Sequence, residues 1–212
     1  RAEARRRRGE TLRRFLGHPA LALGGAVLLL LGLVAAAAPW IAPHPPLRTD
    51  LMNALAPPSA EHWLGTDQFG RDVLSRLIFG ARVSLQVAFF VVAISLVAGT
   101  AIGAVAGYFG GWAERIIVAV NDIMLAFPGF LLALALVAAQ GSSLRSVIVA
   151  VSIAYTPRVA AVMRSVVLTI RPRPFVEASR AIGLTAPRIL VRHVVPNAMA
   201  PVLVAASFGV AS

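Results

Sequence analysis

Long apolar runs divide this chain, and the polar positions between them fall into a few short segments. A helix needs about 20 mostly apolar residues to cross a hydrocarbon core of about 30 Å. Four runs in this chain reach that length, and a fifth, shorter run starts near Ala198. The fifth run is still apolar at Ser212, so we expect the chain to end inside a helix. We predict an all-α, polytopic membrane helix bundle with about five helices. The four runs of spanning length are residues 20–38, 83–108, 116–139 and 147–170.

Arginine is distributed unevenly between the segments that connect these runs. Residues 1–18 carry seven Arg, and residues 164–197 carry six Arg against Glu177 alone, whereas the Arg and acidic residues of 40–82 cancel. Loops on the cytoplasmic side of a membrane collect Arg and Lys. The pattern therefore places the N terminus and the 164–197 segment in the cytoplasm.

This topology predicts four parts of the chain. They are a basic cytoplasmic tail (1–18), a first transmembrane helix (19–40), an extracytoplasmic loop (41–83) and a core (84–212) that includes a cytoplasmic loop (171–197). Within the extracytoplasmic loop, residues 71–82 place apolar side chains at helical spacing, which is typical of a helix lying in the membrane interface. The first apolar run also resembles a secretory signal, but its 19 residues exceed the usual 7 to 15, which favours an uncleaved anchor.

Composition excludes several classes of function. Only 14% of the residues are charged, and all 20 basic residues are Arg. Without Lys the chain lacks the phosphate-binding G-x-x-x-x-G-K-[ST] loop, and without Cys it has no thiolate site. The net charge of +11 gathers at the ends of the apolar runs, so we expect membrane lipid and no nucleic acid as a partner. We predict no catalytic residues, no metal site and no cofactor in this chain.

Four features inside the apolar runs stand out. Gly99, Gly103 and Gly107 recur every four residues, which favours close helix packing in lipid. Asp122 has three possible roles: a solvated residue near a helix end, an ion-pair partner or part of a transport path. Pro128 should kink its helix and so could open a cavity beside it. Arg158 either extends toward the interface or faces the bundle, where a charge marks a pathway.

The cytoplasmic loop is the most informative segment. Its prolines at 172 and 174 end the fourth run, after which Phe175, Ala178, Ser179 and Ile182 fall on one face of a short helix. Gly183 suits the left-handed position that terminates such a helix. Thr185 can cap a second short helix, with Pro187 in its first turn and Pro196 at its end. A loop this structured predicts a protein partner, with a helix resting on lipid headgroups as the alternative.

The loop resembles the Glu-Ala-Ala loop of bacterial ABC importer permeases. Glu177-Ala178-Ser179 is followed by Gly183 and, thirteen residues later, by Pro196. Further matches resemble the second permease subunit of dipeptide, oligopeptide and nickel importers. The departures are Ser179 for the usual Ala, Val195 for the common Leu, and a Pro-rich stretch at 171–174. The further matches are Leu64-Gly65-Thr66-Asp67, Gly70-Arg71-Asp72, Gly107-Tyr108 through Gly111-Trp112, Leu125-Ala126-Phe127-Pro128 and Arg192 through Asn197.

This resemblance implies a type I importer permease bundle with six helices, of which the sixth is apparently missing here. It implies that the segment around Phe175 to Ile182 docks on one of two ABC ATPase subunits, which bind the ATP and Mg. It also implies a heterologous permease subunit, an extracytoplasmic peptide-binding protein and a place in the bacterial inner membrane. Coupling is assigned to Phe175, Glu177, Ala178, Ser179, Ile182, Gly183 and Pro196, and a path or gate to Asp122, Pro128 and Arg158.

Two other classes of function remain. An ion- or proton-coupled secondary transporter would use Asp122 as its site, since such folds carry acidic groups within the membrane. That reading leaves the cytoplasmic loop without a role. A membrane-embedded hydrolase would need Ser142 or Ser143 with a His, and we regard it as remote because no nucleophile spacing matches. Its candidate histidines, His18, His44, His62 and His193, all lie outside the apolar runs.

Overall fold

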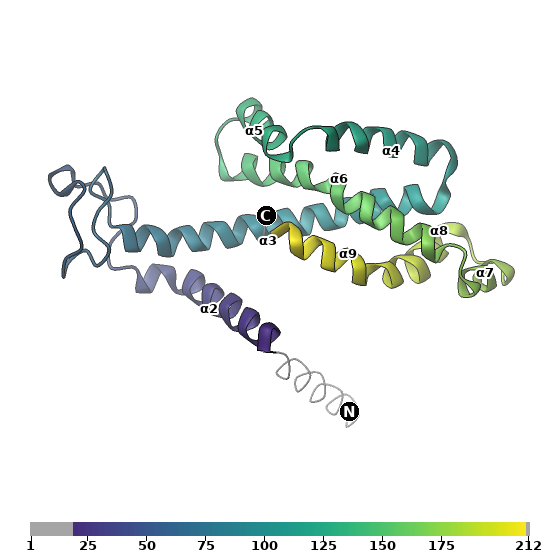
Figure 1. Cartoon of the computed structure of the whole chain (residues 1–212), viewed down its shortest axis with the longest axis horizontal. Coiled ribbons are helices and arrows are strands. Elements are labelled where there is room, and N and C mark those ends of the chain that lie inside the picture. The colour runs from purple at the N-terminus through teal and green to yellow at the C-terminus, as the bar shows by residue number, and fades with distance from the viewer. Residues whose placement is uncertain (1–18, 211–212) are drawn as a thin grey trace, which may run out of the picture. The chain divides into compact units, whose positions relative to one another are not determined.

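The computed structural model describes residues 19–210, so the predicted cytoplasmic tail at 1–18, with His18, lies outside the described residues. The described residues divide into two compact units between Gln86 and Val87. Between residues 19 and 210 the regular elements are helices (Figure 1). One isolated β-bridge pairs Thr66 with Asp72. The predicted all-α fold is confirmed.

The first unit contains α2 (Pro19–Ile41), the 3-10 helix η1 (Leu51–Asn53) and the first turns of α3 (Val73–Phe109). Helix α2 covers the predicted first apolar run and is long and apolar enough to cross a membrane. Leucines from residue 23 onward are exposed, for example Leu28 and Leu29, each at 65%. An apolar helix surface of this kind suits contact with lipid.

Helix α3 is one continuous helix of 37 residues. The separate interfacial helix predicted before the second apolar run is therefore wrong as an independent element. No proline lies between Val73 and Phe109, so nothing in the sequence stops the helix where the polar segment meets the apolar run. At 1.5 Å per residue, α3 is about 55 Å long, more than a hydrocarbon core requires.

The second unit is built around α6 (Leu144–Ile170), which contacts α4 (Gly111–Ala126), α5 (Gly129–Gln140) and α9 (Val195–Val210). Figure 1 shows α4 and α5 on one side of α6 and α9 on the other. Helix α6 starts where the Ser143 hydroxyl accepts a hydrogen bond from the Ser146 N–H at 3.1 Å. Short elements connect α6 to α9: α7 (Pro174–Ala181), α8 (Ala186–Ile189) and the π-helix η2 (Leu190–Val194).

The glycine stripe of α3 faces α6 at close range. A Cβ added at Gly99 would lie 2.6 Å from the Val159 Cβ, and one at Gly103 would lie 2.3 Å from the Ala160 carbonyl oxygen. A Cβ at Gly107 would lie 2.9 Å from the Arg164 carbonyl oxygen. These distances are shorter than real Cβ contacts, so any larger residue would push the two helices apart.

The third apolar run is two helices and not a single kinked one. Helices α4 and α5 meet at 91°, and the break falls at Phe127 and Pro128. Phe127 is extended (φ −86°, ψ 136°), because the ring of a following proline disfavours the helical region for the residue before it. Pro128 also lacks the N–H that would continue the α4 hydrogen-bond ladder. The break is therefore complete.

By length and composition, three described helices can span a membrane: α2, α3 and α6. The bent pair of α4 and α5 is a fourth candidate if it counts as one broken span. The run predicted near Ala198 begins at Val195 as α9, with 16 residues as far as Val210.

Candidate functional site

Helix α7 ends in a backbone arrangement that requires Gly183. The Gly183 N–H donates to the Arg180 carbonyl at 2.9 Å, and the Leu184 N–H donates to the Ser179 carbonyl at 3.1 Å. These two bonds form the Schellman motif, whose residue after the helix adopts left-handed backbone angles. Gly183 has a φ of +81°. Gly183, which the sequence predicts as the end of the short helix, is the residue at which the chain turns.

Helix α7 has a buried face and an exposed face. Val176 is fully buried, whereas Ile182 is 76% exposed and Phe175 is 38% exposed. Ala178 and Glu177 are exposed as well. We call Phe175, Ala178 and Ile182 the exposed α7 face. It is an apolar surface that no described part of the chain covers.

Ser179 does not share that face, although the spacing predicted that it would. It is only 7% exposed, and its hydroxyl donates to the Phe175 carbonyl at 2.7 Å. At 100° per residue, Ser179 lies about 40° from Phe175 and about 60° from Val176, so it sits at the border between the two faces. Packing against the bundle turns this border inward.

The second short helix does not end at Pro196. Helix α8 passes through the π-helical turn η2 into α9, which contains Pro196 near its start. The Val195 N–H donates five residues back, to the Leu190 carbonyl, so the turn is wider just where proline cannot donate. The Asn197 side-chain amide donates to the His193 carbonyl at 2.6 Å. Thr185 occupies the N-cap position of α8 but makes no side-chain cap bond.

The loop is mounted on the bundle by an apolar core. Val176 of α7 and Ile189 of α8 belong to the same buried cluster as Tyr108 of α3 and Met163 of α6. The Arg180 guanidinium lies 5.7 Å from the centre of the Tyr108 ring, a cation–π geometry. Close-packed interiors transmit displacement. Helices α7 and α8 are therefore packed through one core against α3 and α6.

Two polar contacts tie α4 to α6, and sequence reasoning assigned neither. Arg164 Nε donates to Glu114 Oε1 at 2.9 Å, across 50 residues of sequence. The Asn121 side-chain amide donates to the Pro157 carbonyl at 3.0 Å. No local pattern marks Glu114, because the partner that gives it a role is remote in the chain.

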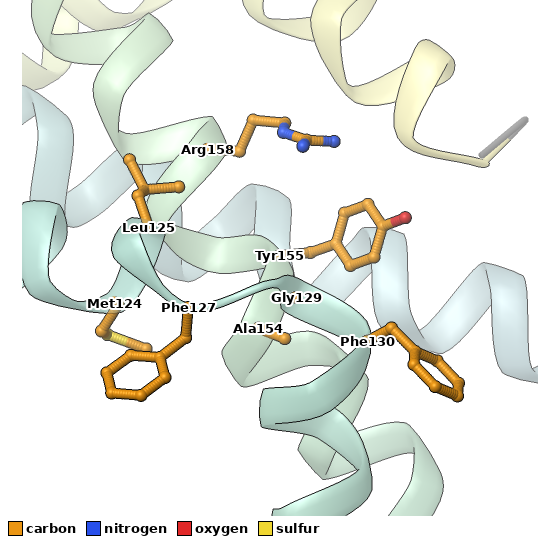
Figure 2. A pocket seen from close by; sticks show the side chains of 8 residues that line it. All are labelled: Met124, Leu125, Phe127, Gly129, Phe130, Ala154, Tyr155 and Arg158. Carbon is orange, nitrogen blue, oxygen red and sulfur yellow. The ribbon is translucent and has the colours of Figure 1, made fainter.

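A pocket of 240 Å³ lies at the break between α4 and α5 (Figure 2). Arg158 and Tyr155 of α6 line it, with the Arg158 guanidinium 5.7 Å from the centre of the Tyr155 ring. Pro128 forms the break beside it. Asp122 is exposed on α4, does not line this pocket and makes no ion pair within residues 19–210. The remaining lining residues are Met124, Leu125, Phe127, Gly129, Phe130 and Ala154.

In the first unit, the turn before α3 is held by a carboxylate. Asp67 accepts hydrogen bonds from the N–H groups of Phe69 and Arg71 at 2.8 and 3.0 Å, and from Arg71 Nε at 2.8 Å. Arg76 also pairs with it. Burial acts to raise the pKa of Asp67, but the hydrogen bonds from Arg71 and Phe69 and the charge of Arg71 outweigh burial and lower it to about 2.

The chain is similar to known transport proteins over most of its length. Residues 99–212, just over half of the chain, match the family described as binding-protein-dependent transport system inner membrane component. Residues 7–58 match the N-terminal transmembrane domain of oligopeptide transport permease C.

Individual relatives agree with these family matches. A dipeptide transport system permease protein of Alkalihalophilus pseudofirmus is 44% identical over 84% of this chain and 58% of its own length. A glutathione transport system permease protein of Pectobacterium atrosepticum is 40% identical over 92% of this chain and 65% of its own length. The chain thus spans from somewhat over half to about two thirds of the length of these relatives.

Proposed function

This chain belongs to the binding-protein-dependent transport system inner membrane component family, and on that basis we propose that it is a permease subunit of an ATP-driven importer for dipeptides or oligopeptides. In this proposal it forms half of a translocation pathway through the bacterial inner membrane. A second, heterologous permease forms the other half. Two ABC ATPase subunits and an extracytoplasmic peptide-binding protein complete the complex.

The exposed α7 face is the observation that carries this proposal. It presents Phe175 and Ile182 outward while Val176 anchors the same helix in the core. Burying a side chain such as Ile contributes about 1.5–3 kcal/mol. The chain has no Lys and so no P-loop, and in this proposal a partner supplies the energy. We assign this face to a groove on an ATPase subunit.

Coupling then follows from how the loop is mounted. When the ATPases close on ATP and Mg, they move α7, and the core around Val176 and Ile189 carries the movement into α3, α6 and α9. Nucleotide drives the transition only if it binds one state of the complex better than the other. The bent pair of α4 and α5, with its pocket at Arg158 and Tyr155, is the part of the bundle that we assign to the path or gate.

The substrate class rests on the relatives, which are named for dipeptides and for glutathione. In our proposal the binding protein makes most of the selection, and the guanidinium of Arg158 interacts with the carboxylate of a passing peptide. The Arg-rich loop and the N terminus face the cytoplasm in this scheme. Ser179 supports α7 from inside, so we assign contact with the ATPase to Phe175, Glu177, Ala178 and Ile182 instead.

The test is peptide uptake by the complete complex, with the full-length permease reconstituted in vesicles. Ile182→Asp places a charge on the exposed α7 face, and we expect uptake and ATPase association to fall at least tenfold, because about 1.4 kcal/mol is a factor of ten. Ala186→Asp is the matched control, because it adds the same charge to the same loop at the first turn of α8, where a helix tolerates an acid. Normal uptake with Ile182→Asp would refute the proposal.

The same vesicles test the alternative. Asp122→Asn removes the acid that a proton- or ion-coupled transporter would need, and we expect uptake to stay within a factor of two of the unmodified complex. Uptake that is lost with Asp122→Asn but kept with Ile182→Asp would favour the secondary transporter.

A further inference from the structure

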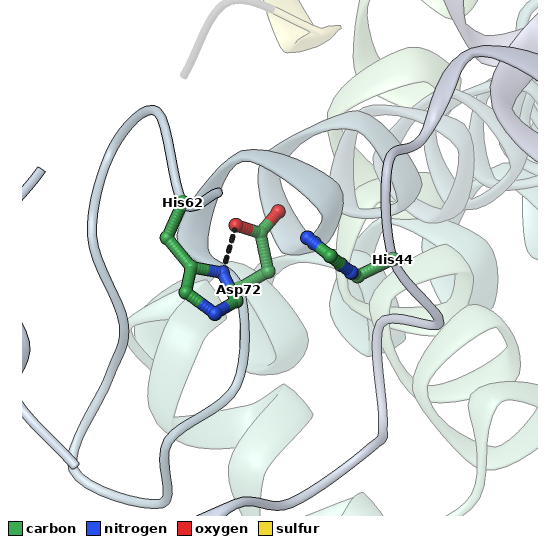
Figure 3. Close-up of side chains that lie close together, drawn as sticks. All are labelled: His44, His62 and Asp72. Carbon is green, nitrogen blue, oxygen red and sulfur yellow. Dashed lines mark hydrogen bonds and ion pairs between the residues drawn. The ribbon is translucent and has the colours of Figure 1, made fainter. Parts of the chain in front are cut away.

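His44, His62 and Asp72 come together in the first unit from three separate segments of the chain. They lie just after α2, in the middle of the loop and immediately before α3 (Figure 3). One ligand atom of each residue lies within 4.8 Å of those of the other two. We call them the His–Asp cluster. None of its three residues belongs to α7 or lines the pocket at Arg158.

We propose that the His–Asp cluster binds one divalent transition-metal ion of the zinc class. Imidazole nitrogens and a carboxylate oxygen are the ligands that zinc takes at sites with an open fourth position. Metal–ligand distances of about 2.0–2.2 Å in tetrahedral geometry put ligand atoms roughly 3.3 Å apart. His62 Nδ1 and Asp72 Oδ1 lie 3.0 Å apart in a hydrogen bond, and zinc would take the place of the proton between them. His44 closes the site by moving at most about 1.5 Å.

Two of the three residues are held by a contact outside the cluster. His44 Nε2 lies 3.0 Å from the Glu61 carbonyl oxygen, which acts as acceptor and fixes the imidazole ring. Asp72 Oδ2 accepts a hydrogen bond from the Ser75 N–H at 2.7 Å, which leaves Oδ1 toward His62. Contacts of this kind orient the ligands of metal sites.

Charge and space also favour a cation. Asp72 supplies a carboxylate, which is ionised at neutral pH. Asp72 is 3% exposed. The cluster borders a cavity of 110 Å³ that Asp50 and Glu61 also line, against one cation, Arg48. Three carboxylates and one guanidinium give this cavity a net charge of −2 with neutral histidines. Such a volume holds an ion and a water ligand.

The test is zinc binding by the full chain in lipid nanodiscs, purified with an affinity tag that contains no histidine. Isothermal titration calorimetry should give one Zn²⁺ per chain, and X-ray absorption at the zinc edge should give two imidazoles in the first shell. His44→Ala and His62→Ala should each weaken binding roughly 100-fold. Asp72→Asn keeps an oxygen for the Ser75 N–H and should weaken binding about tenfold.

His193→Ala is the matched control, because it removes a histidine of the second unit and should leave the zinc affinity unchanged. Circular dichroism and gel filtration of every variant separate loss of a ligand from loss of the fold. Zinc affinity that is equal in His44→Ala, in His62→Ala and in the unmodified chain would overturn the proposal. So would binding that survives His44→Ala alone, because the ligand set would then be a different one.

Discussion

The loop before α3 and the loop after α6 hold their shapes by opposite means. In residues 42–72, the shape depends mainly on carboxylates. Asp67 accepts hydrogen bonds from backbone N–H groups and from the Arg71 side chain, and Asp72 is bonded to the Ser75 N–H and to His62. In residues 171–194, the side chains that hold the loop are apolar, with Val176 and Ile189 buried in the core of the second unit. The hydrogen bonds in the first turn of residues 171–194 join mainly backbone groups.

This difference suits the two loops to different tasks. Hydrogen bonds and ion pairs are directional and respond to protons and metal ions. Apolar packing does not titrate, and a close-packed core moves as one body. The loop after α6 is thus held by contacts that do not titrate, whereas the loop before α3 is held by a cluster of polar and charged groups.

The largest effect should come from replacing Gly70 by Ala. Gly70 has a φ of +71°, and an added Cβ would lie 1.7 Å from the Asp50 carbonyl oxygen, so backbone would have to move. We expect a loss of more than about 4 kcal/mol in the free energy of unfolding of the first unit, since both strain and collision contribute. Limited proteolysis and thermal unfolding of the chain in detergent measure it.

Gly183→Ala is the control in the other loop. Gly183 has a similar φ of +81°, but nothing lies within 4 Å of an added Cβ. Only the left-handed backbone penalty of about 1–2 kcal/mol should appear. Equal losses for Gly70→Ala and Gly183→Ala would show that the collision with Asp50 does not limit the first loop.

A smaller effect should come from Val176→Ala in the loop after α6. Val176 is fully buried, and its loss removes apolar contacts and leaves a cavity, which should cost about 2 kcal/mol of stability. Denaturant unfolding followed by tryptophan fluorescence measures the change. Val191→Ala, at a side chain 69% exposed, should change stability by less than about 0.5 kcal/mol. If both variants lost the same stability, the apolar mounting of α7 would be wrong.

The smallest effect on stability should come from protonation of Asp67 in acid. Its pKa is about 2 in the folded chain against 3.8 for the ordinary group. A lowered pKa means that the ionised form stabilises the fold above pH 3.8, and that this stability is lost as the pH falls from 3.8 toward 2. Proteolysis by an acid-active protease should therefore open the loop before α3 across that range.

Asp67→Asn provides the comparison for that titration. Asn cannot ionise, so the variant should already be less stable at neutral pH and should show no further loss between pH 3.8 and 2 from this position. A variant that keeps the full acid transition of the unmodified chain would assign the transition to another carboxyl group. Residues 171–194 contain Glu177 as their one acid, so their protection should change little over the same range.

Local patterns predicted a good part of this protein. The apolar runs marked α2, α3 and α6, because membrane length and hydrophobicity are properties of consecutive residues. Gly183 could be found because a left-handed helix end needs glycine whatever surrounds it. The four-residue spacing of the α3 glycines likewise marked a close-packed face. Family motifs in the loops carried the resemblance to importer permeases.

Other parts depended on contacts between distant segments. Ser179 stood at the border of two helix faces, and only packing against the bundle turned it inward. Pro128 signalled a bend and its ring accounts for the extended Phe127, but the 91° angle belongs to how α4 and α5 both pack on α6. Pro196 signalled a helix end, yet the π turn before it lets the helix continue.

Sequence alone determined where this chain can cross a membrane, where its loops turn and which family it resembles, because each of these depends on neighbouring residues. Tertiary structure decided which side of α7 is left exposed, how Glu114 finds Arg164 and how His44, His62 and Asp72 meet. Those pairings join residues 10 to 50 positions apart, and no local propensity encodes the three-dimensional path that closes such distances.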